Sequence, residues 1–308
     1  MEALTAAVIP ALHRQVLDGR LPEWLEVHWW HDPEEMVALA PQAEIGWFDL
    51  HEKPPVLQSI EIATGMRWLN TAYAGVDWMP LADLERRGVQ LTCGSGLTAS
   101  QVAEYAVMGI LASAKGFSDI VRAQDRGEWL PMPTCDRDLA GSRALLLGYG
   151  AIGQAIGRML EGFGVAVEPV RSRDTGWRQR LGTFDWIVMS LPGTERTRGM
   201  IGKGEIAALK SDAVVVNCGR ADTLDQDALV EALQARRIGG AVLDVTDPEP
   251  LPEGHPLWSL PNAIVTMHLS GIPTPVSHAR AAERFLRNCH LFHTGLPLEA
   301  QVDLARGY

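Results

Sequence analysis

One glycine pattern constrains the fold of this chain more than any other feature. Residues 143–147, Arg-Ala-Leu-Leu-Leu, have the composition of a buried strand, and residues 154–163 are typical of a helix. The turn between them consists of Gly148, Tyr149, Gly150, Ala151, Ile152 and Gly153. Gly148 permits a tight turn, Gly150 lets the backbone approach a pyrophosphate, and Gly153 allows the helix to pack closely on the strand. The pattern therefore predicts a strand–turn–helix unit whose helix N-terminus faces a phosphate group.

Short apolar runs alternate with amphipathic stretches along the whole chain. This alternation is typical of βαβ units and of a mainly parallel sheet. We expect strands at residues 44–48, 66–70, 143–147, 165–170, 186–190, 213–217, 240–244 and 263–267. The chain has 308 residues, which is about twice the length of a usual domain, so we expect two domains.

One of these domains is expected to be inserted into the other. Residues 98–128 are expected to form one long helix, which starts with a capping box and is apolar on nearly every face in its middle. The C-terminal tail is rich in helix formers and can pack back on the N-terminal part. We predict two doubly wound α/β domains with parallel sheets. A flavodoxin-like domain comprises residues 1–97 and 273–308, and a Rossmann domain of residues 98–272 is inserted into it.

The composition excludes several classes of protein. The chain is 46% apolar and 21% charged, as globular proteins are, and its formal net charge of −11 argues against a general nucleic-acid binder. It contains no apolar run of membrane-spanning length and no basic segment of a signal peptide at its start. The cysteines, which form no CxxC pair, are Cys93, Cys135, Cys218 and Cys289. We therefore expect reduced thiols in the cytoplasm, and neither a disulfide framework nor a metal site.

The residues that follow strand 165–170 bear on which dinucleotide would bind. A carboxylate at this point holds the ribose hydroxyls of NAD, whereas arginine accepts the 2′-phosphate of NADP. Arg171, Ser172 and Arg173 follow the strand, and two guanidiniums with a hydroxyl suit a phosphate dianion. Glu168 has about the spacing of the NAD-selecting acid, but it lies inside the strand. The sequence favours NADP(H) over NAD(H).

Three later strand ends also carry polar side chains. Arg220, Glu249 and His268 each follow a predicted strand, and Asp244 is the last residue of one. Open α/β sheets bind ligands at the carboxyl ends of their strands. Reduction of a 2-keto acid requires a cation that holds the substrate carboxylate and an acid that protonates the carbonyl oxygen. Arginine is suited to the first task, and histidine beside a carboxylate is suited to the second near neutral pH.

Together these motifs resemble those of the D-2-hydroxyacid dehydrogenase family, also called the D-isomer-specific 2-hydroxyacid dehydrogenases. The resemblance extends from about Ala74 to His268. It rests on residues 74–77, 99–105, 148–153, 217–220 and 244–250 and on His268. It implies an NAD(P)-dependent oxidoreductase that acts on the CH–OH group of D-2-hydroxy acids, with hydride passing between the nicotinamide and C2.

The resemblance also implies a role for each catalytic residue. Arg220 is similar to the substrate-binding arginine of the family, Glu249 to the acid that pairs with the catalytic histidine, and His268 to the general acid and base. The backbone amides of Ala74 and Gly75 match the loop that receives the substrate carboxylate. This match implies that the domain of residues 1–97 and 273–308 binds the substrate.

Further positions are placed by the same resemblance. Asp244 matches the residue that contacts the nicotinamide carboxamide. Cys218, which lies beside Arg220, is also expected among the cofactor-binding residues. A nucleophilic role for its thiol lacks support, because no base is near it in the sequence. The ribose-selecting acid of the family falls 23 residues after the first glycine, where this chain has Arg171. Trp47 lies where glyoxylate and hydroxypyruvate reductases have a pocket tryptophan, although packing in the core is equally open.

The resemblance implies a homodimer, because the long helix and the arm after it dimerise in the family. Trp129 follows this helix, and both an interface role and a core role are open for it. The sequence departs from the family pattern at Ala221, where glycine is usual, and at Met267, where proline is usual. Neither change removes a functional group, but both affect loops beside candidate site residues.

The favoured function is an NADP(H)-dependent 2-ketoacid reductase, such as a glyoxylate or hydroxypyruvate reductase. The Glu249 and His268 pair differs from the Gln and His pair of formate dehydrogenases, which disfavours formate. An NAD-dependent enzyme similar to phosphoglycerate dehydrogenases is an alternative, although many of those carry regulatory domains for which 308 residues leave no room. A second alternative function is that of a dinucleotide-sensing binding protein similar to corepressors.

Overall fold

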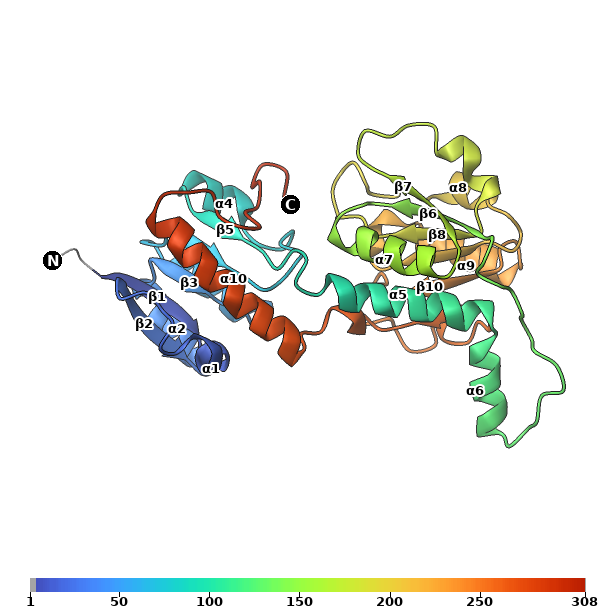
Figure 1. Cartoon of the computed structure of the whole chain (residues 1–308), viewed down its shortest axis with the longest axis horizontal. Helices are drawn as coiled ribbons and strands as arrows, with labels where there is room; N and C mark the ends of the chain where they lie inside the picture. The colour runs from blue at the N-terminus through green and yellow to red at the C-terminus, as the bar shows by residue number, and fades with distance from the viewer. Residues whose placement is uncertain (1–3, 308) are drawn as a thin grey trace. The chain divides into compact units, whose positions relative to one another are not determined.

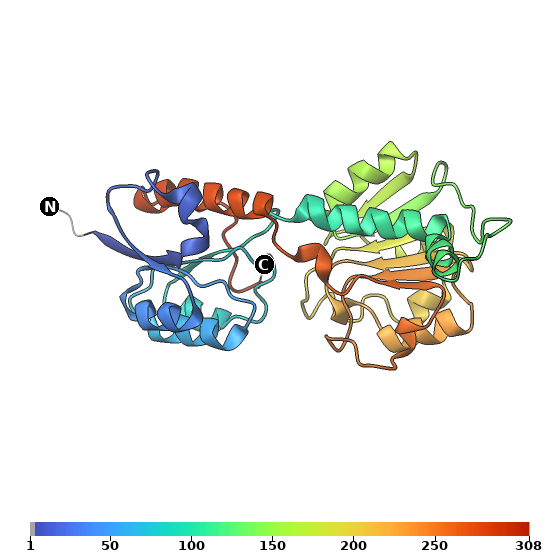
Figure 2. The same cartoon turned by 90° about the horizontal axis from the view of Figure 1, so that it is seen from below.

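The computed structural model describes residues 4–307, and the chain divides into two compact units (Figure 1). The first unit combines the segment that ends at Thr98 with the segment that begins at Pro273, and the second unit is Ala99–Ile272. Each unit contains a parallel sheet between two layers of helices (Figure 2). The predicted fold class, two doubly wound α/β domains, is confirmed.

Within the described residues, the sheet of the first unit has five strands in the order β2-β1-β3-β4-β5. They are β1 (Thr5–Pro10), β2 (Leu25–Trp30), β3 (Ile45–Trp47), β4 (Trp68–Asn70) and β5 (Gln90–Thr92). All neighbouring strands are parallel, and the order is that of flavodoxin-like sheets. The sequence predicted β3 and β4 but missed the other three.

Alternate side chains of β1 point toward the two opposite helix layers of this unit. Val8 points toward α2 (Pro33–Leu39), α3 (Lys53–Ile62) and α4 (Leu81–Arg86), whereas Ala7 and Ile9 point toward α1 (Arg14–Leu17) and α10 (Pro275–His293). Successive residues of a strand face opposite sides of the sheet, so one short strand contributes to both cores. Figure 2 shows α10 lying along one face of this sheet.

The sheet of the second unit has six parallel strands among the described residues, in the order β11-β10-β9-β8-β6-β7. They are β6 (Arg143–Leu147), β7 (Ala166–Val170), β8 (Trp186–Met189), β9 (Val214–Asn217), β10 (Gly240–Leu243) and β11 (Ala263–Val265). Each overlaps a strand expected from the sequence. After β7 the chain crosses to the other side of β6, so the strand order reverses at β6. Such a switch point is where doubly wound sheets bind ligands.

Helices cover both faces of this second sheet. α5 (Ala99–Ala114) and α7 (Ala151–Gly162) pack on one face, and α8 (Lys203–Ala207) and α9 (Gln226–Gln234) pack on the other. Gly109 lets α5 approach β10 closely, because a Cβ atom at this position would lie 2.3 Å from Cγ1 of Val242. Within residues 4–307, none of the helices combines the length and the hydropathy that crossing a membrane requires.

The prediction of one continuous helix over residues 98–128 was wrong. α5 ends at Ala114, and a separate helix, α6 (Phe117–Asp125), begins after Gly116. Gly116 has φ +61°, in the left-handed region that ends helices and favours glycine. Trp129, which follows α6, is 96% exposed, so the core role considered for it is also wrong.

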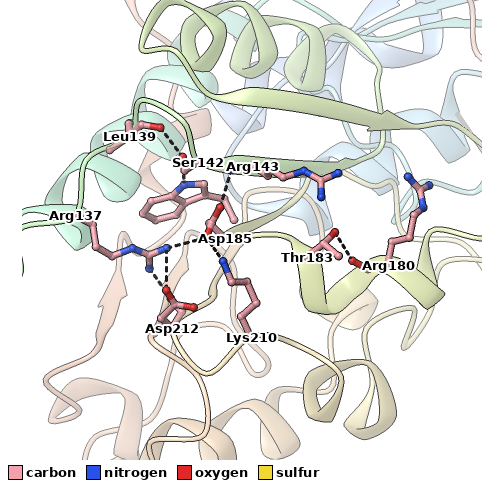
Figure 3. A network of polar contacts seen from close by, with 10 residues as sticks. Arg137, Leu139, Ser142, Arg143, Arg180, Thr183, Asp185, Lys210 and Asp212 are labelled. Carbon is pink, nitrogen blue, oxygen red and sulfur yellow. Dashed lines mark hydrogen bonds and ion pairs between the residues drawn. The ribbon is translucent and has the colours of Figure 1, made fainter.

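A polar network joins the amino ends of the strands in the second unit (Figure 3). The carboxylate of Asp185 accepts a hydrogen bond from the Arg143 amide at 2.7 Å and another from Nζ of Lys210 at 2.5 Å. The Arg137 guanidinium lies 3.5 Å from Asp185 and 4.8 Å from the centre of the Trp186 ring. Since Arg143 begins β6 and Trp186 begins β8, this network fixes the two strands at the end opposite the glycine turn.

The network predicts a pH-dependent contribution to stability. Partial burial raises the pKa of Asp185, but the hydrogen bonds from Lys210 and Arg143 and the nearby positive charges outweigh it, so the pKa lies below its ordinary value. We expect Asp185→Asn to lower the free energy of unfolding by about 1–3 kcal/mol near neutral pH. Because the folded-state pKa is lowered, the contribution is complete above the unfolded pKa of about 4 and is lost as the pH falls.

Urea unfolding of the wild type and the variant across this pH range measures the difference. Asp138→Asn is the matched control, because the Asp138 side chain is 84% exposed in its ion pair with Lys115. Exposed pairs contribute roughly 0–1 kcal/mol. Equal losses in the two variants would contradict a structural role for the buried network.

Candidate active site

The glycine turn after β6 has the geometry that its sequence predicts. Gly148 has φ +90°, and a Cβ atom there would lie 2.8 Å from the Ser190 carbonyl oxygen. A Cβ atom at Gly153 would lie 2.2 Å from the Gly148 carbonyl oxygen. These two glycines are therefore required by the fold of the turn itself.

Gly150 differs from the other two glycines, because no heavy atom beyond the residue itself and its two chain neighbours lies within 4 Å of the position its Cβ would take. It is the N-cap of α7, and no side chain caps this helix. The amides of the first helical turn have no acceptor within the helix, and the positive end of the helix dipole favours an anion. This open, uncapped turn fits the pyrophosphate of a dinucleotide.

Arg171, Ser172 and Arg173 lie exposed at the carboxyl end of β7. The Arg171 guanidinium lies 5.1 Å from the centre of the Tyr149 ring, a cation–π distance, and its amide donates to Oδ2 of Asp174 at 2.6 Å. The Tyr149 ring in turn lies close to α7 at Gly157. These contacts place a guanidinium beside the glycine turn.

Glu168 is the acid whose distance in sequence from the first glycine is close to that typical of NAD binding. Its contacts are those of a residue that stabilises the sheet. It lies within β7, opposite Leu145 of β6. Its carboxylate forms ion pairs with Arg143, at 3.6 Å, and with Arg180. These pairs hold the carboxylate along the strand, away from its carboxyl end.

Arg220, Glu249 and His268 converge at the carboxyl edge of the second sheet. Nδ1 of His268 lies 2.9 Å from Oε2 of Glu249, and Oε1 of Glu249 accepts the Thr246 amide at 3.0 Å. Arg220 follows β9 at the same edge, and its positive charge favours the ionised form of Glu249 and partly opposes protonation of His268. The structure thus brings together the three residues that the sequence proposed as catalytic.

The pKa values of Glu249 and His268 are both shifted from their ordinary values. The hydrogen bond that Nδ1 of His268 donates to Glu249 raises the pKa of His268 above its ordinary value, against the opposing effects of desolvation and of Arg220. Burial alone would raise the pKa of Glu249, but the contacts with His268 and with the Thr246 amide outweigh it and the pKa is lowered. His268 therefore keeps its proton to a higher pH than a free imidazole, and Nε2 is the ring nitrogen that Glu249 does not engage.

Asp244 supports the turn that presents His268. Its backbone carbonyl accepts the His268 amide at 2.6 Å, and its carboxylate accepts hydrogen bonds from Thr266, at 2.6 Å, and from Ser270. His268 has φ +57° and Met267 has φ +54°, an uncommon conformation for residues other than glycine. The buried carboxylate holds this left-handed turn in place.

Cys218 is buried below the same edge, with Sγ 3.4 Å from the Met189 carbonyl oxygen. Burial, together with the negative charge of Asp244, raises the pKa of its thiol to about 12. A neutral, buried thiol is a poor nucleophile. The assignment of Cys218 to the cofactor-binding residues stays a prediction.

Trp47, Ala74 and Gly75 belong to the first unit and follow or end strands β3 and β4. Trp47 has no exposed surface, stacks on His13 at 4.1 Å and donates its Nε1 hydrogen to Asp49 at 2.6 Å. This burial agrees with the packing role left open for Trp47, and not with a side chain lining a pocket. Ala74 is exposed and Gly75 is partly exposed.

Asp49 is a residue that the sequence analysis missed. Its carboxylate accepts hydrogen bonds from Oγ1 of Thr71 at 2.5 Å and from the Ala72 amide at 2.7 Å, and burial raises its pKa. It therefore fixes the segment just before Ala74 and Gly75. Within residues 4–307 the amides of Ala74 and Gly75 have no acceptor, so they are available to a ligand. The position of Asp49, soon after a buried strand, was the signal that could have identified it.

The Glu249 and His268 pair generates a prediction that does not depend on any reaction. We expect Glu249→Gln to lower the pKa of His268, because the variant removes the negative charge that stabilises the imidazolium. An NMR titration of the imidazole protons measures the shift. Glu253→Gln is the control, since Glu253 is an exposed acid in the same segment. An unchanged His268 titration in Glu249→Gln would contradict the pairing.

Comparison with known proteins agrees with this geometry. Residues 107–270 match the family model described as "D-isomer specific 2-hydroxyacid dehydrogenase, NAD binding domain". A curated relative, the glyoxylate reductase/hydroxypyruvate reductase of Mus musculus, is 30% identical over 220 residues, which are 66% of this chain and 67% of the relative.

Two solved structures are similar over almost the whole chain. A D-isomer specific 2-hydroxyacid dehydrogenase family protein from Aeromonas salmonicida has a TM-score of 0.84 and 28% identity, and the match covers 98% of this chain and 100% of that one. A D-isomer specific 2-hydroxyacid dehydrogenase from Xanthobacter autotrophicus, solved with NADPH and MES, has a TM-score of 0.78 and 25% identity, with 99% and 100% covered.

Proposed function

This chain belongs to the D-isomer-specific 2-hydroxyacid dehydrogenase family, and we propose that it is an NADP(H)-dependent reductase of small 2-keto acids. The family consists of NAD(P)-dependent oxidoreductases that act on 2-hydroxy acids. The observation that carries the proposal is the 2.9 Å contact between His268 and Glu249, at the same sheet edge as the glycine turn. Glyoxylate and hydroxypyruvate are the candidate substrates, because the relative from Mus musculus is named for them.

The proposed mechanism assigns a task to each side chain. The guanidinium of Arg220 holds the carboxylate and carbonyl oxygens of the keto acid, and its positive charge polarises the carbonyl. A reduced nicotinamide supplies a hydride to C2 when it is bound. Protonated His268 donates its Nε2 proton to the carbonyl oxygen, and Glu249 stabilises the imidazolium and orients the ring through Nδ1. The product is the 2-hydroxy acid, of D configuration by family resemblance.

Other residues complete the proposed site. Asp244 maintains the His268 turn and is assigned to the nicotinamide carboxamide by resemblance. The Ala74 and Gly75 amides are assigned to the substrate carboxylate, and their lack of an acceptor within residues 4–307 supports this role. The first-turn amides of α7, beside Gly150, would hold the pyrophosphate.

The acid–base assignment predicts the effect of His268→Ala. We expect turnover of glyoxylate with NADPH to fall by about 10²–10⁴-fold, since the variant lacks the proton donor. NADPH affinity, measured by fluorescence titration, should change little. His31→Ala is the control, because His31 forms a similar 2.9 Å contact with Glu35 on the surface. Near-normal turnover in His268→Ala would refute the assignment, and a wild type that binds NADPH without reducing any keto acid would favour a dinucleotide sensor.

The cofactor preference is proposed from the residues after β7. Arg171, Ser172 and Arg173 provide two cations and a hydroxyl where a carboxylate would select NAD. The acid with the nearest spacing, Glu168, is engaged in ion pairs along the strand. The similar protein from Xanthobacter autotrophicus was solved with NADPH, which supports the same preference here.

This preference predicts the effect of replacing both arginines. We expect Arg171→Ala/Arg173→Ala to weaken NADPH binding by at least about tenfold, because charge-assisted hydrogen bonds to a phosphate are lost, and to leave NADH binding nearly unchanged. Isothermal titration with each cofactor measures both effects. Arg236→Ala/Arg237→Ala removes the same charge from another exposed segment and serves as the control. An unaltered ratio of the two affinities would show that the 2′-phosphate assignment is wrong.

A homodimer and a cytoplasmic location complete the proposal. α6 and the segment after it expose large apolar side chains: Phe117, Ile120, Val121, Trp129 and Met132. A second copy of the chain would cover this surface, as the family resemblance implies. All four cysteines are free, which suits a reducing compartment. A monomer mass in sedimentation equilibrium would contradict the dimer.

A further inference from the structure

We propose that Arg196 is a third cation of the 2′-phosphate site and thereby a determinant of NADP selectivity. This inference rests on the proposed NADP(H) dependence. Arg196 belongs to the loop after β8 and lies outside the glycine motif and the Arg171, Ser172 and Arg173 segment. Two separate loops, one from each side of β6, would then bind the same phosphate.

The strand order brings these loops together. β6 lies between β7 and β8, so the loops that follow β7 and β8 flank the glycine turn. The end of β8 lies directly against that turn, because Oγ of Ser190 donates to the Gly148 carbonyl at 2.9 Å. Farther along the loop, Nη2 of Arg196 lies 3.5 Å from the Ser172 carbonyl oxygen. The Arg196 guanidinium therefore reaches the segment that is proposed to bind the phosphate.

The loop that carries Arg196 has a defined shape. Oγ1 of Thr197 donates to the Pro192 carbonyl at 2.6 Å, and it accepts the Thr194 amide at 3.0 Å. These side-chain hydrogen bonds close a short turn around residues 194–197. These hydrogen bonds hold the backbone of Arg196 in place.

Arg196 differs from the nearby Arg198 in its contacts with acidic side chains. Arg198 forms ion pairs with Glu195 at 3.2 Å and with Asp222 at 3.8 Å. Arg196 is exposed and forms no ion pair with a carboxylate of residues 4–307. Two more arginines, Arg171 and Arg173, lie on the segment that it contacts. Clustered like charges repel each other, and in a chain with a net charge of −11 such a cluster marks a place where an anion is favoured.

A phosphate monoester suits this arrangement. At neutral pH it carries a charge between about −1.5 and −2, and its three terminal oxygens accept hydrogen bonds from several guanidiniums. Arg171 and Arg173 would approach from the loop after β7, and Arg196 would approach from the loop after β8. NADH has a hydroxyl at this position, so it gains far less from the third cation, and Arg196 increases discrimination rather than general affinity.

Two fragments of the cofactor test the proposal, since they differ in the 2′-phosphate. Isothermal titration of the full chain with 2′,5′-ADP and with 5′-AMP compares binding with and without this group. We expect Arg196→Ala to weaken 2′,5′-ADP by about 5–10-fold and 5′-AMP by less than about twofold. Arg196→Lys should retain part of the affinity, because it keeps the charge but not the planar donor geometry.

Arg198→Ala is the matched control on the same loop, and we expect it to change both affinities by less than about twofold, since Arg198 is paired with acids. Thermal unfolding of each variant checks that the fold is kept. Equal effects of Arg196→Ala on the two fragments, or no effect on either, would overturn the role of Arg196. If Arg171→Ala/Arg173→Ala also fails to weaken 2′,5′-ADP, the NADP proposal itself falls; if that variant weakens it and Arg196→Ala does not, only the present inference falls.

Discussion

The parallel arrangement of the six described strands in the second unit is the constraint on which the candidate site depends. In a parallel sheet every strand ends at the same edge, so every loop that follows a strand begins there. The glycine turn after β6, the arginines after β7, and Arg220, Glu249 and His268 after later strands meet for this reason. The opposite edge has a different task, since Asp185 and its cationic partners tie the strand starts together there.

The electrostatics of the carboxyl edge contrast with those of the whole chain. The chain carries a net charge of −11, yet exposed arginines gather on the two loops beside the glycine turn. At the other end of the same edge, Glu249 raises the pKa of His268, and Arg220 moderates the effect. Both features are those expected of the proposed reduction of a keto acid by NADPH.

Most of the second unit could be predicted from the sequence because its strands are continuous apolar runs buried on both faces. β6, Arg-Ala-Leu-Leu-Leu, is an example, and its bounds agree with those expected. The first unit was harder: β5, Gln-Leu-Thr, is polar at both ends, and β1 ends in Pro10. The break in the long helix was missed because an isolated glycine in a helical pattern has two outcomes. At Gly116 the left-handed conformation ended the helix, and a Cβ atom there would have met Oγ1 of Thr134 at 2.3 Å.

The sequence by itself determined the type of fold, the position of the glycine turn and the chemical groups at the candidate site, because these depend on local periodicity and on residues close together in the chain. Only the tertiary structure decided how those groups behave. The raised pKa of His268 requires Glu249 at 2.9 Å, and the burial of Trp47 requires His13 stacked on it. Arg196 meets Ser172 because the loops after β7 and β8 leave the same edge of the sheet on either side of β6. Each of these properties depends on distance and burial among residues that are separated in the sequence, and no local pattern encodes them.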